Sequence, residues 1–250
     1  PVRALTAARK IRDWLLKHKE IVILGGGLVG VKTAAYLRLA GFAVSLVEKE
    51  NHLLPQALTK NASRLVEHHL QRLGIRLLLG CLLEDLQEEN GTLKSIKVDG
   101  QWIPADTLLI AIGSTPNIKF LENTGLLKDG ELLVSPVLQT ADAKIYAAGD
   151  AITVTTAGGE KYKPSTWPQA VSQGKLAAEN LFRSVPLPLN VFTRPNSMNL
   201  QGLSLVILGA SMPEAAIISY DRMADGVYRE LFLRDRKIAG GALVGDISGA

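Results

Sequence analysis

A glycine-rich turn between an apolar strand and a helix narrows the fold of this chain more than any other segment. The run IVILGGGLVGVKTAAYL places Gly25, Gly27 and Gly30 in the spacing GxGxxG. In such a turn the first glycine permits a sharp bend, the second lets the backbone approach a pyrophosphate, and the third lets helix and strand pack closely. The helix that follows offers free N–H groups and a partial positive charge to two phosphates. The pattern therefore predicts a dinucleotide-binding turn.

An acidic residue downstream completes this pattern. Glu48 ends the next apolar run, 18 residues after Gly30, where a carboxylate can accept hydrogen bonds from the adenosine ribose. We therefore expect a Rossmann-type domain that binds NAD(H). Glu48 would repel a 2′-phosphate, which favours NADH over NADPH, whereas the adjacent Lys49 favours tolerance of that phosphate.

The order of apolar segments predicts an α/β fold with a parallel sheet. Short apolar runs that alternate with helical periodicity are typical of strands covered by helices. Asn90-Gly91 and Asp99-Gly100 separate alternating apolar and polar residues, which predicts an antiparallel meander over residues 82–105. From Pro186 onwards, short strands predict a separate α+β tail packed on the rest. The predicted helices cover residues 6–19, 28–39, 59–73 and 168–181, and the predicted strands cover residues 21–24, 43–47, 75–79, 107–112, 144–148, 203–208, 216–220, 227–233 and 237–244.

Composition excludes several classes of protein. The 250 residues are 47% hydrophobic, enough for a large core, and the single Cys81 can form neither an internal disulfide nor a metal cluster. No run approaches the roughly 20 apolar residues of a membrane helix, and no signal peptide opens the chain. Lys and Arg alternate with acids, so the net charge of +4 does not indicate nucleic acid binding. We expect a soluble, cytoplasmic protein.

No group of side chains predicts acid, base, nucleophilic or metal chemistry. The four histidines lack the spacing to cysteines or paired acids that a metal site uses. Ser114 and Thr115 follow a glycine but have no neighbouring base to activate them. We therefore predict no catalytic residues and no metal site.

Two further apolar runs end in glycine and offer contacts to a flat ligand. TLLIAIGSTPN ends a predicted strand with Ala111 and Gly113, where backbone can pass close to a ligand. KIYAAGDA ends with Gly149, after which Asp150 can accept hydrogen bonds from a polyol. On chemistry alone, ordinary loops of an α/β fold fit these residues equally well.

Together the motifs resemble those of the pyridine nucleotide-disulfide oxidoreductase superfamily. GGGLVG, LVEKENHLLP, AIGSTPN, IYAAGDA and WPQAVSQGKLAAEN follow its order and spacing. The tail VYRELFLRDRKIAGGALVGD resembles the branch of NADH:rubredoxin reductases and nitrite reductase large subunits. The resemblance implies an NADH-dependent flavoprotein oxidoreductase, in which hydride passes from NADH to FAD and electrons pass to a redox partner protein or a small acceptor. It also implies homodimer contacts through the C-terminal strands.

The same resemblance implies the order of domains and two cofactor sites. Residues 1–19 would be a linker helix from a FAD domain, 20–112 the NAD(H)-binding domain, 113–185 the C-terminal half of the FAD-binding domain, and 186–250 a truncated α+β domain. The implied NAD(H) residues are Gly25, Gly26, Gly27, Leu28, Val29, Gly30, Glu48, Lys49, Ala111, and, at the nicotinamide end, Ile112 and Gly113. The implied FAD residues are Gly149, Asp150 at the ribityl chain, and Trp167 and Pro168 beside the isoalloxazine.

Two departures from that family bear on function. The family opens with another GxGxxG for the FAD pyrophosphate, and this chain, which starts at Pro1 without a methionine, contains none. We expect a piece of a longer protein, with FAD bound in the parent rather than in this chain alone. Lys32 stands where the family has a glutamate, and it either pairs with a ligand phosphate or points to solvent. A non-catalytic NAD-binding or assembly module and a flavin-free dehydrogenase are the alternative functions.

Overall fold

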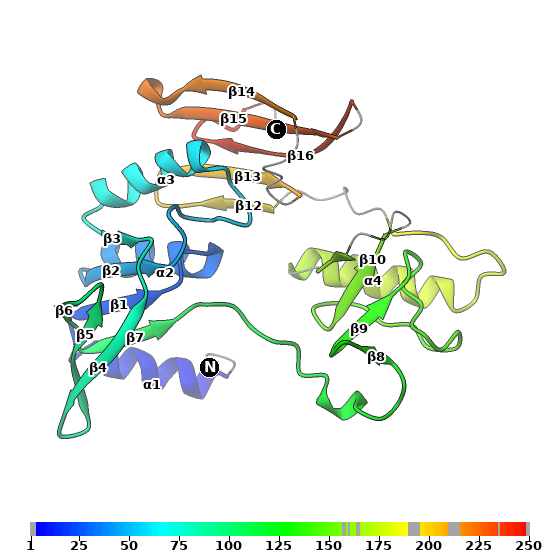
Figure 1. The fold of residues 1–250 in the computed structure, drawn as a ribbon, viewed down its shortest axis with the longest axis horizontal. Coiled ribbons are helices and arrows are strands. Elements are labelled where there is room, and N and C mark those ends of the chain that lie inside the picture. Colours follow the sequence, from blue (N-terminus) through cyan, green and yellow to red (C-terminus); the bar gives the residue numbers. More distant parts are fainter. Residues whose placement is uncertain are drawn as a thin grey trace. The chain divides into compact units, whose positions relative to one another are not determined.

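The computed structural model describes residues 4–156, 159, 161–163, 166–189, 196–209, 216–234 and 236–248. The chain divides into two compact units. Unit 1 comprises Pro1–Gly113 and Ser197–Ala250, and unit 2 comprises Ser114–Asn196. Unit 1 therefore combines the two ends of the sequence, which are blue to green and orange to red in Figure 1.

The centre of unit 1 is a four-stranded parallel sheet with the order β3-β2-β1-β7. Ile21 of the central strand lies opposite Val44 on one side and Thr107 on the other. Because other layers cover both faces of this sheet, Ile21, Val22 and Ile23 are all buried, which explains the uninterrupted apolar run. The predicted Rossmann-type sheet is confirmed. Its strands are β1 (Glu20–Leu24), β2 (Ala43–Glu48), β3 (Arg76–Leu79) and β7 (Thr107–Ile110).

Alternate residues of this sheet pack against two different layers. Ile21 and Ile23 share a core with α2 (Leu28–Leu39) and α3 (Lys60–Arg72). Val22 shares a second core with the antiparallel meander of β4 (Leu83–Glu89), β5 (Thr92–Val98) and β6 (Gln101–Pro104). The four turn residues 90, 91, 99 and 100 all have φ between 48° and 75°, as two-residue hairpins require. The predicted meander is confirmed.

The first helix, α1 (Leu5–Leu15), lies beside β7, an edge strand of this sheet (Figure 1). Its Trp14 Nε1 donates to the Thr107 hydroxyl of β7 at 3.0 Å. The helix ends four residues before the predicted end at Lys19. The reason is that the N–H groups of Lys19 and Glu20 donate to the Asp106 carboxylate at 2.7 and 2.9 Å, which directs the chain into β1.

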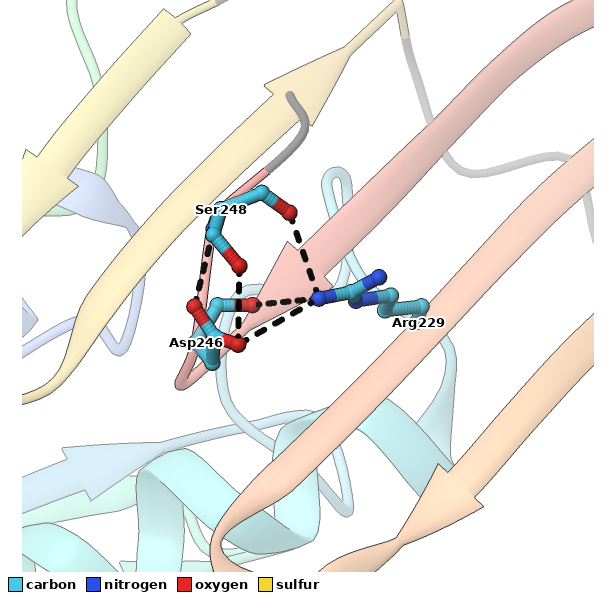
Figure 2. A network of polar contacts seen from close by, with 3 residues as sticks. All are labelled: Arg229, Asp246 and Ser248. Carbon is cyan, nitrogen blue, oxygen red and sulfur yellow. Dashed lines mark hydrogen bonds and ion pairs between the residues drawn. The ribbon is translucent and has the colours of Figure 1, made fainter.

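The C-terminal residues form a five-stranded sheet that belongs to unit 1. Its residues Leu205 and Val244 lie in the same core as Ile21. The buried Glu230 carboxylate accepts hydrogen bonds from the N–H and hydroxyl of Thr59, the N-cap of α3, at 3.1 and 2.5 Å. The strands run in the order β12 (Asn196–Asn199), β13 (Ser204–Leu208), β16 (Lys237–Val244), β15 (Val227–Arg234) and β14 (Ala216–Arg222), with the 3-10 turn η2 (Met223–Asp225) between β14 and β15. Arg229 of β15 donates to the carbonyls of Asp246 and Ser248, which follow β16, each at 3.3 Å (Figure 2).

Unit 2 is built on a small sheet with the order β11-β10-β9-β8, against which α4 packs through Ala177. The predicted helix over residues 168–181 is confirmed, but the predicted strand over residues 144–148 is wrong. Tyr146 forms only an isolated bridge with Gln139, because a turn in which the Asp142 carboxylate accepts the N–H of Lys144 at 2.8 Å folds this segment back. The elements are η1 (Lys119–Leu121), β8 (Leu127–Lys128), β9 (Glu131–Val134), β10 (Ile152–Thr155), β11 (Lys161–Tyr162) and α4 (Trp167–Asn180).

Units 1 and 2 differ from the predicted division into residues 1–19, 20–112, 113–185 and 186–250. The boundary after Gly113 lies beside the predicted one, whereas the C-terminal strands share unit 1 with the parallel sheet. The four-domain division stays a prediction. No helix within the described ranges is long and apolar enough to cross a membrane.

Candidate cofactor sites

The glycine turn of unit 1 has a backbone that larger residues could not adopt. Gly25 has a φ of +110°, and its N–H donates to the carbonyl of Val47 at 2.8 Å. A Cβ added at Gly25 would lie 2.5 Å from the carbonyl oxygen of Ala111, and one added at Gly30 would overlap the carbonyl of Gly25. These glycines therefore allow β1, β7 and α2 to approach one another closely.

Gly27 occupies a different environment, at the N-cap of α2. Among the residues that the structure describes, none has an atom within 4 Å of a Cβ added there, so the turn faces open space on this side. No side chain caps the helix, and the first N–H groups of a helix have no partner within it. Open space and free donors together fit a pyrophosphate.

Glu48 closes the turn from the end of β2. Its carboxylate accepts the N–H of Gly26 at 2.5 Å and the N–H of Glu50 at 2.9 Å, and the residue is only 6% exposed. A Cβ at Gly26 would lie 3.0 Å from the Cβ of Glu48. The predicted ribose acceptor is therefore also an internal support of the glycine turn, a role that the sequence did not reveal.

The two lysines near this turn are both exposed. Lys49 pairs with Glu50 at 3.7 Å, and their side chains are 71% and 50% exposed. Lys32, in the first turns of α2, lines a shallow surface pocket of about 410 Å³ together with Val29, Thr33, Tyr36 and Leu37. Lys32 thus points to the surface, beside apolar side chains of its own helix.

The residues after β7 complete the unit 1 site. The N–H of Ala111 donates to the carbonyl of Leu24 at 2.8 Å, which keeps this loop beside the glycine turn. Ile112 and Val29 are each 70% exposed, and Gly113 has a φ of +105°. The site lies at the carboxyl ends of β1 and β7, the position where open α/β sheets bind ligands.

Unit 2 brings together the residues implied for a flavin. Gly149 has a φ of +85°, and its N–H donates to Oε1 of Gln173 in α4 at 2.8 Å. Asp150 is exposed and has no hydrogen-bond partner in the described part of the chain. Trp167, at the start of α4, is 81% exposed. An unpaired carboxylate and an exposed aromatic ring fit a ligand with hydroxyls and a flat ring system.

Sequence reasoning missed two polar groups of unit 2. Gln173 is 1% exposed, and only its helical spacing to Ala177 and Asn180, which share its buried face, could have indicated an inward position. Glu131 of β9 pairs with Lys161 and Lys163, each at 2.7 Å. Their hydrogen bonds lower the pKa of this carboxyl to about 2. These ion pairs link β9 to the β11 segment across β10. No grouping of His, Cys, Asp or Glu in the described residues could hold a metal ion.

Comparisons with known proteins agree with this architecture. The family model described as pyridine nucleotide-disulphide oxidoreductase matches residues 1–174. Rubredoxin-NAD(+) reductase of Pseudomonas putida is 25% identical over 234 residues, covering 92% of this chain and 58% of the relative.

Solved structures share the fold at lower identity. A ferredoxin reductase for the CYP199A2 system from Rhodopseudomonas palustris superposes with a TM-score of 0.87 at 22% identity, covering 97% of this chain and 60% of the other. A water-forming NADH oxidase from Lactobacillus brevis, bound to NADH, superposes with a TM-score of 0.82 at 20% identity, covering 97% and 58%. The chain thus spans about three-fifths of the length of these proteins. With its glycine turn, its parallel sheet and a family match over 1–174, the chain belongs to the pyridine nucleotide-disulphide oxidoreductase family.

Proposed function

We propose that this chain supplies the NAD(H) site and one half of the FAD site of an NADH-dependent flavoprotein oxidoreductase. The observation that carries the proposal is the uncapped N-terminus of α2, where Gly27 faces open space and Glu48 holds the turn from behind. The proposed NAD(H) residues are those of the glycine turn together with Glu48, Lys49 and residues 111–113, and the proposed FAD residues are Gly149, Asp150, Trp167 and Pro168.

The residues of this chain bind and orient the cofactors. The first N–H groups of α2 would hold the pyrophosphate, and exposed Val29 and Ile112 would contact the apolar parts of the dinucleotide. In unit 2, Asp150 would accept hydroxyl hydrogen bonds while Trp167 contacts the ring system. Bound FAD supplies the redox chemistry, because it accepts a hydride and releases electrons singly or in pairs. No side chain of this chain needs to transfer a proton in that step.

The preference for NADH over NADPH rests on Glu48. A carboxylate has about four acceptor positions, and backbone donors use two of them, so Glu48 retains acceptors for a ribose hydroxyl. The same negative charge would repel a 2′-phosphate. The solved relative from Lactobacillus brevis is bound to NADH, which supports this preference.

The electron acceptor and the setting of the protein are part of the proposal. The relatives' names, rubredoxin reductase and ferredoxin reductase, support transfer to a small redox protein. A cytoplasmic location is supported by the single Cys81. A homodimer through the C-terminal region is supported by the edge strand β14, whose residues are all exposed.

The visible absorption spectrum of the purified full-length protein tests the proposal. Flavin bands that bleach when NADH is added without oxygen are the expected result. A protein that binds NADH but has no flavin bands would be a nucleotide-binding module, or a flavin-free dehydrogenase if it turns NADH over. Either of these results would refute the proposed function.

A further inference from the structure

The buried face of α4 carries carboxamide side chains where a core helix usually carries apolar ones. Gln173 and Asn180 are 1% and 2% exposed, and they lie with Ala177 on the face that packs against the sheet of unit 2. One turn before Gln173, the amide of Gln169 contacts the Tyr162 hydroxyl of β11. Ala177 and the partly buried Leu176 supply apolar contacts of this helix with the core of unit 2, and the buried carboxamides add polar ones.

The two buried carboxamides have defined backbone partners. Gln173 Oε1 accepts the N–H of Gly149 at 2.8 Å. Asn180 Nδ2 donates to the carbonyls of Val137 and Leu187, and its Oδ1 accepts the N–H of Leu187, all at 2.9 Å. Hydrophobic burial is non-directional, whereas a hydrogen bond has a preferred distance and angle. Rotating or sliding α4 would leave these groups unpaired. The bond of Gln173 therefore fixes the part of the helix next to Gly149, and the bonds of Asn180 fix its C-terminal end.

The bond of Gln173 acts where the flavin half-site is built. Gly149 has a φ of +85°, and a Cβ added there would lie 3.6 Å from the Cβ of Ala170 in α4. Asp150 follows this turn directly, and Trp167 begins the same helix. Two segments that are separate in sequence are therefore joined by the hydrogen bond between Gly149 and Gln173.

We propose that Gln173 is a positioning residue of the flavin half-site. By accepting the N–H of Gly149, it holds the turn that presents Asp150 at a fixed angle to the N-terminus of α4. Gln173 is buried and reaches the turn rather than the ligand, so it acts through Gly149. The inference rests on the proposed function, because FAD is the ligand that both elements would contact.

The test compares three variants of the full-length protein. Gln173→Leu keeps the side-chain volume but removes the acceptor, and Gln173→Glu keeps the acceptor. Asn180→Leu is the matched control, because it removes a buried carboxamide at the far end of the same helix. The measurements are the dissociation constant for FAD, the midpoint potential of the bound flavin, the melting temperature, and the hydrogen exchange of the Gly149 amide without flavin.

Gln173→Leu is expected to raise the FAD dissociation constant at least about 10-fold, to shift the midpoint potential and to speed exchange of the Gly149 amide. Gln173→Glu should restore slow exchange and most of the affinity. Asn180→Leu should lower the melting temperature with FAD affinity unchanged. Equal losses of affinity for Gln173→Leu and Asn180→Leu, or unchanged affinity and exchange for Gln173→Leu, would overturn the inference. A wild-type protein without flavin would instead refute the proposed function, and the exchange of Gly149 distinguishes the two failures.

Discussion

Replacing Glu48 by glutamine tests whether this side chain supports the glycine turn. Each carboxylate oxygen accepts one backbone N–H, from Gly26 and from Glu50. A glutamine can accept only one of them and turns its NH₂ group toward the other. A buried N–H left without an acceptor costs about 1–3 kcal/mol, and the remaining bond loses its charge-assisted part, about 1 kcal/mol. We expect a total loss of about 2–4 kcal/mol in the free energy of unfolding, which lowers the melting temperature by about 5–15 °C for a chain of this size.

The assay combines thermal unfolding with titrations of NADH and NADPH. Glu48→Gln should weaken NADH binding about 10-fold or more, since a charged acceptor for the ribose is lost, and should reduce the discrimination against NADPH. The control is Glu50→Gln, an exposed side chain whose removal should change the unfolding free energy by less than about 0.5 kcal/mol. If Glu48→Gln had the same melting temperature as the wild-type protein, the two backbone hydrogen bonds would not hold the turn and the reasoning would be wrong.

Two further predictions concern the glycine turn and the C-terminal sheet. Gly27→Ala should leave the melting temperature unchanged, because no described residue lies within 4 Å of the added methyl group, but it should abolish tight NADH binding. Gly25→Ala should instead lower the free energy of unfolding by about 2–4 kcal/mol, because this position has a positive φ and the methyl group would clash with a carbonyl. For Glu230, burial raises the pKa, and the hydrogen bonds from Thr59 lower it by less. The folded state therefore binds more protons, and stability falls as pH rises from the ordinary pKa of a glutamate through the raised one. Glu230→Gln can still accept the N–H of Thr59 and can donate its NH₂ group to the Thr59 hydroxyl in place of accepting from it. This variant should lack the fall in a series of unfolding curves across that range, whereas parallel curves for the two proteins would contradict the assignment.

Much of unit 1 could be predicted because its local signals agree with its tertiary structure. The run of apolar residues 21–24 is a central strand, residues 28–39 are helical as predicted, and the Asn-Gly and Asp-Gly pairs form the turns of the meander. Unit 2 was harder to predict, since its strands β8 and β11 have two residues each and carry no periodicity. The wrong strand at 144–148 is apolar like a strand, but the hydrogen bond that the N–H of Lys144 donates to the Asp142 carboxylate turns its backbone away from a partner.

In the candidate sites, too, local features could be predicted and long-range contacts could not. The identity of Gly25, Gly27 and Glu48 could be predicted, because the spacing of a fingerprint reflects local backbone geometry. The internal hydrogen bonds of Glu48 and the contact of Gln173 with Gly149 could not, since they depend on how segments 22 and 24 residues apart meet. Sequence spacing therefore predicts the local geometry of the turn better than the long-range contacts that support it.

None of the described residues of the C-terminal sheet is among those of the candidate dinucleotide site, and yet this sheet is connected to the glycine turn through the core. The N–H of Leu54 donates to the carbonyl of Gly26 at 2.9 Å, and Leu54 is held at a φ of +54°. Such a conformation costs about 1–3 kcal/mol and persists only where the surroundings enforce it. Leu54 is 1% exposed, within the same cluster as Leu205 and Val244 of the C-terminal sheet. Packing of that sheet therefore helps to keep the strained loop, and with it the glycine turn, in the shape that a dinucleotide requires.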